Sequence, residues 1–406
     1  MFPAASLLTI ILLALSITTS PIEVGNSPIT LPIARRLNVS NGTINLLQQD
    51  RARVVALKDN SLRHGGHHSA PVINVANKYL IAVGIGSPPT TYNLIVDTGS
   101  SNTWVGASTP YVVTKTSVNT GQPVANSYGT GVYFSGTEYT DTVTLGRGLT
   151  VANQSICVAS TTRGFISVDG ILGIGPVDLT EGTLVDEPTT TIPTVTNNLH
   201  SQGTIHREMF SISFEPTNSE PVTNGELTFG GTIANKHAGP IAYTPITTTD
   251  RAANYWGIDQ SISYGSMTIL SSNAGIVDSG TTFLYIASDA YRMYMSATGG
   301  NPDPDTGLLL ISSTQYNALE NLNFHIGSET YTLTPNAQIW PRSLNTYIDG
   351  SINAIYLIVG DIGTPSGQGF DFINGYTFLE RFYSVFDTTR SRIGFAKTQY
   401  TDATTN

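Results

Sequence analysis

Residues 93–105, NLIVDTGSSNTWV, run from an apolar segment directly into an aspartate, a hydroxyl residue and a glycine. The segment before Asp97 is rich in Leu, Ile and Val, which predicts a buried β-strand. Glycine and small hydroxyl residues permit a tight turn and the close approach of another backbone. Because a buried carboxylate is costly unless it is hydrogen-bonded or functional, Asp97 is a candidate functional residue.

A second copy of this pattern lies in the other half of the chain. Residues 274–286, AGIVDSGTTFLYI, align Asp278 with Asp97 and repeat the order of apolar strand, acid, hydroxyl and glycine. Each copy is followed by another apolar segment that contains glycine, DGILGIG at 169–175 and FINGYTF at 372–378. The repetition predicts two similar lobes, each of which contributes one carboxylate.

The rest of the chain fits a protein built from β-strands. From residue 79 onward, short runs rich in Val, Ile, Thr and Tyr alternate with clusters of Gly, Pro, Asn and Ser, which is typical of an all-β fold. Helical periodicity is limited to three short segments: residues 192–203, 287–299 and 313–322. With 406 residues, of which 40% are hydrophobic, the chain is long enough for two lobes with a large core.

The two aspartates suggest a specific chemistry. If a pseudo-twofold axis relates the lobes, both turns meet on that axis and the carboxylates of Asp97 and Asp278 come close together. Two carboxylates in such proximity share one proton and titrate as a pair. One can act as a base on a bound water while the other donates a proton to a carbonyl oxygen. This is acid and base catalysis of peptide-bond hydrolysis, and it needs neither a metal nor a cofactor.

Over residues 75–402 the sequence resembles the pepsin-like aspartic proteases, and most closely the secreted fungal polyporopepsin-like group. The resemblance rests on motifs in a fixed order: VDTGSSNTWVGA, SYGTGVYFSGTEYTDTVTLG, VDGILGIGP, GELTFGG, YWGI, GIVDSGTT and FINGYTFLERFYSVFDTTRSRIGFA. It implies a bilobal all-β fold with a cleft between the lobes. It also implies that Asp97 and Asp278 are the catalytic pair.

The same resemblance assigns roles to the hydroxyl residues of the two turns. Thr98 and Ser279 are expected to link the turns through their hydroxyls, and Ser279 stands where threonine is commoner in the family. Ser100 and Thr281 are expected to donate hydrogen bonds to the outer oxygens of the carboxylates.

A β-hairpin flap is expected over the cleft. Tyr128, Gly129 and Thr130 match the family's flap tip, and Trp104 is the expected partner of the flap tyrosine. The segment after Tyr128 is one residue longer than the family pattern. If the extra residue shifts the register of the hairpin, Tyr133 takes the place of Tyr128, so both tyrosines stay candidates.

Asn374 and Tyr376 stand where leucine and aspartate are usual in the family, and this departure is interpreted as a feature of the fungal subgroup.

A catalytically inactive binding protein with the pepsin fold is the alternative to an endopeptidase. Loss of either aspartate or of the flap would favour that alternative, and retention of Asp97, Asp278 and the flap motif favours the enzyme. A glycosidase is disfavoured, because duplicated Asp-Thr/Ser-Gly turns are not associated with the carboxylate pairs of glycoside hydrolysis.

The N-terminal segment predicts export and processing. An apolar run at residues 7–17 suits a signal peptide and is too short to span a membrane. We expect a signal peptide over residues 1–20 and a propeptide over 21–70, with an end that the sequence leaves open. An N-terminal lobe over 71–235 and a C-terminal lobe over 236–406 follow. The expected location is extracellular, in preference to a vacuole.

Charge separates this leader from the body. Residues 1–70 hold six of the 19 basic residues but only three of the 29 acidic ones. A basic leader fits a propeptide that inhibits its own acidic cleft, and Lys58 or Arg63 is predicted to pair with Asp97 and Asp278. The acidic body has no basic stripe to meet phosphates, which disfavours nucleic acid as a partner. The expected partners are protein or peptide substrates, and a monomer is expected.

Other motifs carry less information. Three candidate glycosylation sites fit a secretory route: Asn38, Asn41 and Asn153. Three histidines lie close together in the leader: His64, His67 and His68. No carboxylate or thiol joins them, so a metal site is not expected. The single cysteine, Cys157, lies in an apolar segment and is expected to be a buried structural thiol.

Overall fold

The structure is a computed structural model, and it describes residues 28–37, 46–58, 77–128, 132–146, 148–165, 167–220 and 222–405. Several predictions therefore fall on residues outside the described part of the chain. They concern the signal peptide, glycosylation at Asn38 and Asn41, Arg63 and the histidine cluster. Within the described part, no helix is both long enough and apolar enough to cross a bilayer.

Strands dominate the molecule. The strands of the first half are β1 (Ile29–Leu37), β2 (Asn77–Ile85), β3 (Thr90–Asp97), β4 (Thr103–Val105), β5 (Val118–Ser127), β6 (Tyr133–Gly146), β7 (Leu149–Arg163), β8 (Gly170–Gly173), β9 (Met209–Phe214) and β10 (Val222–Phe229). Those of the second half are β11 (Ala238–Pro245), β12 (Gly257–Tyr264), β13 (Met267–Val277), β14 (Leu284–Ile286), β15 (Asn301–Pro302), β16 (Leu309–Ile311), β17 (Leu322–Ile326), β18 (Glu329–Leu333), β19 (Ile355–Leu357), β20 (Val359–Asp361), β21 (Phe372–Asn374), β22 (Phe382–Asp387) and β23 (Arg392–Lys397).

Within the described part of the chain, five short α-helices accompany the strands: α1 (Leu46–Lys58), α2 (Val195–Ser201), α3 (Ser288–Thr298), α4 (Ser313–Asn317) and α5 (Tyr376–Leu379). Helices α2, α3 and α4 fall within the three segments predicted to be helical. Helix α1 lies in the basic leader, where no helix was predicted. Its buried positions, Leu46, Leu47, Val54 and Leu57, pack into the main core, so contacts with the body stabilise it.

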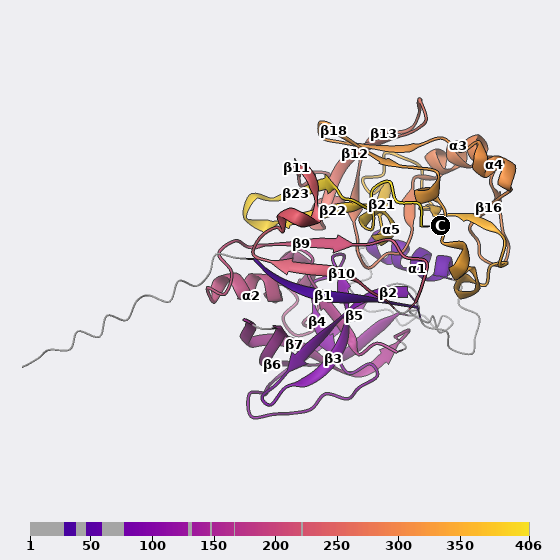
Figure 1. The fold of residues 1–406 in the computed structure, drawn as a ribbon. Helices are drawn as coiled ribbons and strands as arrows, with labels where there is room; N and C mark the ends of the chain where they lie inside the picture. Colours follow the sequence, from indigo (N-terminus) through magenta and orange to yellow (C-terminus); the bar gives the residue numbers. More distant parts are fainter. Residues whose placement is uncertain are drawn as a thin grey trace, which may run out of the picture.

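The strands of the described residues form three sheets of 13, seven and three strands. The largest runs in the order β11-β23-β22-β9-β10-β1-β2-β3-β8-β4-β7-β6-β5, the next in the order β18-β17-β12-β13-β21-β14-β20, and the smallest in the order β15-β16-β19. The N-terminal half lies at the bottom of Figure 1 and the C-terminal half at the top, with β9, β10, β1 and α1 between them. This arrangement confirms the predicted all-β, bilobal fold.

The two halves repeat one local topology around the aspartates. Strand β3 pairs in parallel with β8, and β4 pairs with β8 in the antiparallel direction. In the second half β13 pairs in parallel with β21, and β14 pairs antiparallel with β21. Each aspartate therefore leaves the end of a strand that a second, short strand holds in place.

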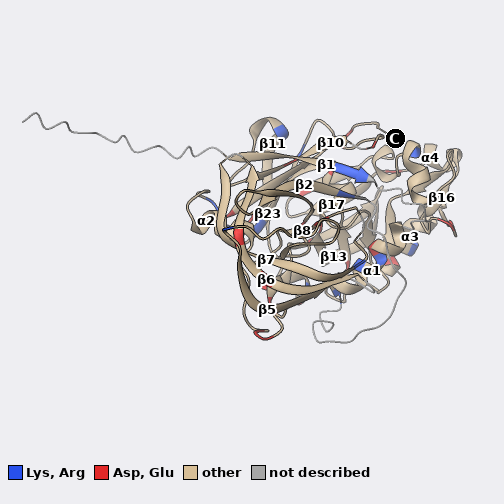
Figure 2. Cartoon of the chain, turned by 90° about the horizontal axis from the view of Figure 1, so that it is seen from below, with Lys and Arg blue, Asp and Glu red and all other residues tan. Residues whose placement is uncertain are grey.

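The leader is built into the fold. Strand β1 lies between β10 and β2 in the large sheet, and Figure 2 shows basic residues on both leader elements, β1 and α1. Arg35 of β1 is buried and forms ion pairs with Glu220 and Glu380, each at 3.1 Å. Its guanidinium also lies over the rings of Trp340 and Tyr376. These contacts give Tyr376, a departure from the family pattern, a role in packing against the leader.

Candidate active site

The two aspartate turns meet between the halves of the molecule and are linked by their hydroxyl residues. The Thr98 backbone N–H donates to Ser279 Oγ at 3.1 Å, and the Ser279 N–H donates to Thr98 Oγ1 at 2.9 Å. The hydroxyls in turn donate across the interface, from Thr98 to the carbonyl of Val277 and from Ser279 to the carbonyl of Val96. These are the two residues in which the sequence predicted a link.

Each carboxylate is buried and held by its own turn. Ser100 Oγ donates to Asp97 Oδ2 at 2.6 Å, and Thr281 Oγ1 donates to Asp278 Oδ2 at 2.5 Å. The glycine that follows each hydroxyl residue donates its N–H to the other oxygen, at 2.9 Å in both turns. A side chain at either glycine would collide with the opposite aspartate, within 2.6 Å at most, so only glycine lets the turns approach this closely.

One guanidinium joins the two carboxylates. Arg53 of α1 donates from Nη2 to Asp97 Oδ1 at 2.6 Å, and to Asp278 from Nε at 2.8 Å and from Nη2 at 3.0 Å. Lys58 does not pair with the aspartates: its Nζ donates to the Ile362 carbonyl and to Thr364 Oγ1 instead. The prediction for Lys58 is wrong because α1 turns that residue away from the pair.

The surroundings shift the pKa values of the two aspartates in opposite directions. Burial raises the pKa of Asp97, and the nearby charge of Asp278 raises it further against the opposing effect of Arg53. Burial also disfavours ionisation of Asp278. There, however, the charge and the hydrogen bonds of Arg53, with those of Thr281 and Gly280, hold the pKa below its usual value. Because the two carboxyls interact so closely, they titrate as a coupled pair.

The hairpin of β5 and β6 places Tyr128 beside Asp97. Strand register sets Ser127 opposite Tyr133, and the Tyr128 N–H donates to the Val132 carbonyl at 2.8 Å, which closes the hairpin. Tyr133 also pairs with Arg163 of β7, on the side of the hairpin away from β5. This register leaves Tyr128 just past the end of β5 and Tyr133 within β6. Gly129 and Thr130 lie outside the described residues.

A cavity next to the aspartates receives both leader and body side chains. Its lining residues are Gln49, Asp50, Arg53, Lys78, Ile95, Asp97, Tyr128, Val132, Phe165, Ile171 and Gly280. Trp104 is fully buried behind it and packs on Phe134 and Phe165, and Tyr128 packs edge to face on Phe165. Trp104 and Tyr128 thus share Phe165 as an aromatic neighbour.

The sequence interpretation missed Arg53, Asp50 and Lys78. A signal was available for two of them, because Asp50 and Arg53 are three residues apart and would share one face of a helix.

Cys157 is buried, as predicted, and burial raises the pKa of its thiol. Asn153 is exposed in β7 with a φ of 52°, and its glycosylation stays a prediction. Among the described residues no group of three His, Cys, Asp or Glu side chains is arranged to hold a metal ion.

Comparison with known proteins identifies the class. The sequence model of the eukaryotic aspartyl protease family matches residues 78–398. The chain belongs to this family, and it is an aspartic endopeptidase with the pepsin-like bilobal fold. The predicted family is therefore confirmed.

Individual relatives are similar over most of the chain. Polyporopepsin from Irpex lacteus is 60% identical over 339 residues, which cover 83% of this chain and 99% of that protein. The crystal structure of the aspartic proteinase from Irpex lacteus superposes with a TM-score of 0.82 at 54% identity, covering 94% of this chain and all of the other. Rhizopuspepsin from Rhizopus chinensis is 28% identical, with coverage of 94% and 95%.

Proposed function

We propose that the chain is a secreted acid endopeptidase, made as a zymogen, that hydrolyses peptide bonds with a water activated by Asp97 and Asp278. The observation that carries this proposal is the reach of one guanidinium, that of Arg53, to both carboxylates. Two carboxylates that one planar group can bridge are close enough to hold a water between them once that group has left.

The reaction follows from the shared proton of such a pair. The ionised carboxylate accepts a proton from the water as its oxygen attacks the peptide carbonyl carbon, and the protonated carboxylate donates to the carbonyl oxygen. The bond to nitrogen then breaks as the intermediate collapses and a proton passes to the leaving amine. Tyr128 and Trp104 are proposed to form the flap side of the site, where closure over the substrate excludes water.

The leader is proposed to inhibit the enzyme until the pH falls. Arg53 occupies the space between the carboxylates, and α1 covers the cavity beside them. The lowered pKa of Asp278 means that its ion pair with Arg53 is fully formed above the usual aspartate pKa of about 4. The pair is lost as the pH falls through the lowered value. Acid therefore weakens the contact that holds α1 over the site.

Export rests on the sequence of the leader. The apolar run at residues 7–17 and the three glycosylation motifs support a secretory route. Expression in a yeast host and N-terminal sequencing of the protein in the medium would test the signal peptide over residues 1–20.

The central experiment is acidification of the full-length chain purified at neutral pH. At about pH 3–4, where unperturbed aspartates titrate, we expect the leader to be cleaved and hydrolysis of denatured haemoglobin to begin. Pepstatin, an inhibitor of aspartic proteases, should abolish the hydrolysis. A chain that stays folded in acid and cleaves nothing would favour the alternative, an inactive binding protein with the pepsin fold.

A further inference from the structure

A buried tryptophan is hydrogen-bonded to the segments of both aspartates. The indole Nε1 of Trp256 donates to the backbone carbonyl of Ile174 at 3.0 Å. The backbone N–H of Ile174 donates in turn to the carbonyl of Asp97 at 2.9 Å. On the other side, the backbone N–H of Val277 donates to the carbonyl of Trp256 at 3.0 Å. Because Val277 directly precedes Asp278, one series of hydrogen bonds connects the backbones behind the two carboxylates.

The indole supplies the step of this series that crosses between the halves of the molecule. Ile174 follows β8 of the first half, and Trp256 precedes β12 of the second half. The other two hydrogen bonds each stay within one half and join backbone groups alone, so they do not depend on the side chain at residue 256. Substitution of Trp256 therefore removes the connection between the halves and leaves the rest of the series intact.

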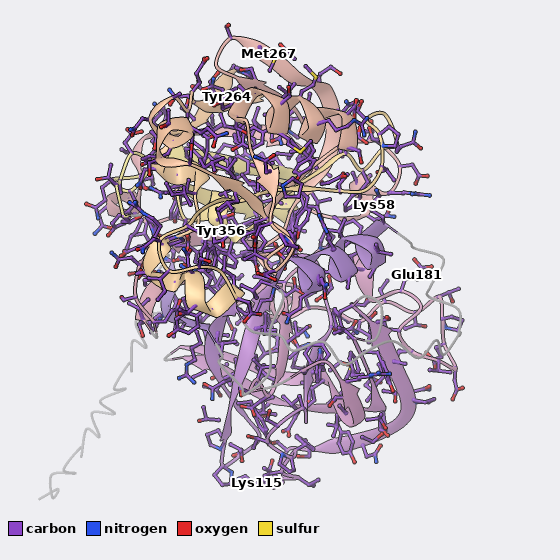
Figure 3. All side chains as sticks on the ribbon, turned by 90° about the vertical axis from the view of Figure 1, so that its right-hand side faces the viewer. Lys58, Lys115, Glu181, Tyr264, Met267 and Tyr356 are labelled. Carbon is purple, nitrogen blue, oxygen red and sulfur yellow. The ribbon has the colours of Figure 1, made fainter. Side chains whose placement is uncertain are left out.

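The large sheet between the halves holds the indole in place. Trp256 is 3% exposed and packs edge to face on Phe210 of β9 and on Phe386 of β22, with ring centroids 5.8 and 5.2 Å apart. These two phenylalanines stack on each other and are paired across their strands. The halves extend away from this sheet, with Lys115 near the far end of one and Met267 near the far end of the other (Figure 3). Packing thus fixes the indole at the junction on which the relative orientation of the halves depends.

We propose that Trp256 is a positioning residue of the endopeptidase, whose indole fixes the orientation of the Asp97 turn relative to the Asp278 turn. The hydroxyl link between Thr98 and Ser279 joins the turns themselves, and a link at one place sets a distance but permits rotation about it. The Trp256 link joins the segments behind the turns, so the two links together also set an orientation. Catalytic groups must be held to within about 0.5 Å and 10–20° of their productive geometry, and the second link therefore contributes to the rate.

The test compares Trp256→Phe with a matched control, Trp340→Phe, after acid activation of both. Phenylalanine keeps an aromatic ring at the position but has no N–H to donate. Trp340 is also buried and packs edge to face on Phe283, whereas its Nε1 has no hydrogen-bond partner within the described part of the chain. Titration of the active sites with pepstatin prevents a smaller amount of folded enzyme from being read as a lower rate.

The kinetic expectation is a loss in kcat without a matching change in KM. In Trp256→Phe we expect kcat to fall about tenfold, because a misplacement of a fraction of an ångström slows an oriented reaction. KM should change less than about twofold, since Trp256 is not among the residues that line the cavity beside Asp97. Trp340→Phe should keep both constants.

The pH dependence of kcat gives a readout that a merely structural role would not move. Two close carboxylates lose their protons in two separate steps, and the separation of the steps decreases as the carboxylates move apart. We expect the two apparent pKa values of the pair to approach each other by about half a unit in Trp256→Phe and to stay in place in Trp340→Phe. Lys78, whose charge interacts with both aspartates, is present in every protein compared.

The inference rests on the proposed catalysis by both carboxylates, and the two can fail separately. Hydrolysis of no peptide by the unmodified enzyme would remove the proposed function, and the inference with it. An active unmodified enzyme with unchanged kcat and pH dependence in Trp256→Phe would overturn the inference alone. Equal losses in Trp256→Phe and Trp340→Phe would do the same, because they would show a general effect of removing a buried indole.

A second measurement does not depend on the folding of Trp256→Phe. The chain has three tryptophans, so the unmodified enzyme labelled with nitrogen-15 gives three indole N–H signals in a nuclear magnetic resonance spectrum, and Trp104→Phe and Trp340→Phe assign them by elimination. The Trp256 signal should move over the pH range in which the aspartate pair titrates, because its hydrogen bonds lead to the backbone of Asp97. The Trp340 signal should stay constant. A Trp256 signal that also stays constant over this range would contradict the link.

Discussion

The two aspartate turns have matching hydrogen bonds and different surroundings. In each turn a hydroxyl residue and a glycine N–H hold the carboxylate at nearly equal distances. The Asp97 turn faces the flap side of the cavity, with Ile95, Ile171 and Tyr128. The Asp278 turn carries two of the three hydrogen bonds from Arg53. Duplication thus preserved the geometry of each carboxylate, while the surroundings set its ionisation.

The contrast extends to the strands behind the turns. At corresponding positions, β8 has the buried apolar Leu172 and β21 has Asn374. Asn374 forms two reciprocal amide hydrogen bonds with Gln260, at 2.9 and 3.2 Å, and both residues are buried. The backbone carbonyl of Asn374 also accepts a hydrogen bond from the backbone N–H of Asp278. This departure from the family pattern is therefore matched by a polar partner on β12.

The largest expected effect comes from removing either carboxylate. Asp97→Asn and Asp278→Asn should each lower kcat at least 100-fold, because acid and base catalysis supplies about 10² to 10⁴ in rate and each residue is needed for it. Single-turnover hydrolysis of a peptide measures the loss, with circular dichroism to show that the fold is kept. More than about one per cent of activity in either variant would break the equivalence of the two turns.

Substitution of Tyr128, the predicted flap residue, tests the surroundings of the Asp97 turn, because both residues line the same cavity. Tyr128→Ala should lower kcat/KM about 10- to 100-fold, since a loosely closed site misplaces the substrate. Tyr133→Ala is the matched control, because Tyr133 lies in β6 opposite Ser127 and does not line the cavity beside Asp97, and we expect only a small effect. Steady-state kinetics of both variants decides the order, and a larger loss in Tyr133→Ala would assign the flap to that residue.

Substitution of Arg53 tests the ion pairs that join this residue to the carboxylates of both turns. An Arg53→Gln precursor lacks the guanidinium that holds the pKa of Asp278 below its usual value. The carboxylates should therefore bind protons at a higher pH, and the leader should be released at a higher pH as well. We expect the midpoint of leader cleavage to move up by about one pH unit. Mass spectrometry of samples taken over a pH series measures the midpoint.

Arg51→Gln on the same helix is the control for this shift. Arg51 is exposed, so its loss removes one positive charge from the leader without touching either aspartate. If both variants moved the midpoint equally, the overall charge of the leader would matter and the contact of Arg53 would not.

The smallest expected effect concerns the strands behind the turns. Asn374→Leu, which copies the first half, should lower the free energy of unfolding by about 1–3 kcal/mol because it leaves the Gln260 amide buried without a partner. The double variant Asn374→Leu, Gln260→Leu should recover much of the loss, since both polar partners are then removed together. Chemical denaturation of the precursor at neutral pH compares the three proteins. A double variant no more stable than Asn374→Leu would show that the pair does not act as a unit.

The sequence by itself determined the all-β fold, the two lobes and the identity of both aspartate turns. Each of these is encoded locally, as an apolar strand followed by acid, hydroxyl and glycine, and the repetition made the local pattern specific. The resemblance to the family implied the link between Thr98 and Ser279, and the hydrogen bonds between the two turns show it.

Only the tertiary structure decided which leader residue meets the aspartates. The basic leader predicted that a cation would meet the pair, and the residue that does so is Arg53 rather than Lys58. The sequence did not predict helix α1, and the rotation of this helix about its axis sets which of its side chains face the cleft. Strand register likewise placed Tyr128 in the cavity. The contact of Asp50 with Lys78 and the backbone of Thr282 joins three distant segments. No local pattern encodes such a contact, because its energy arises only when packing brings those segments together and excludes water from them.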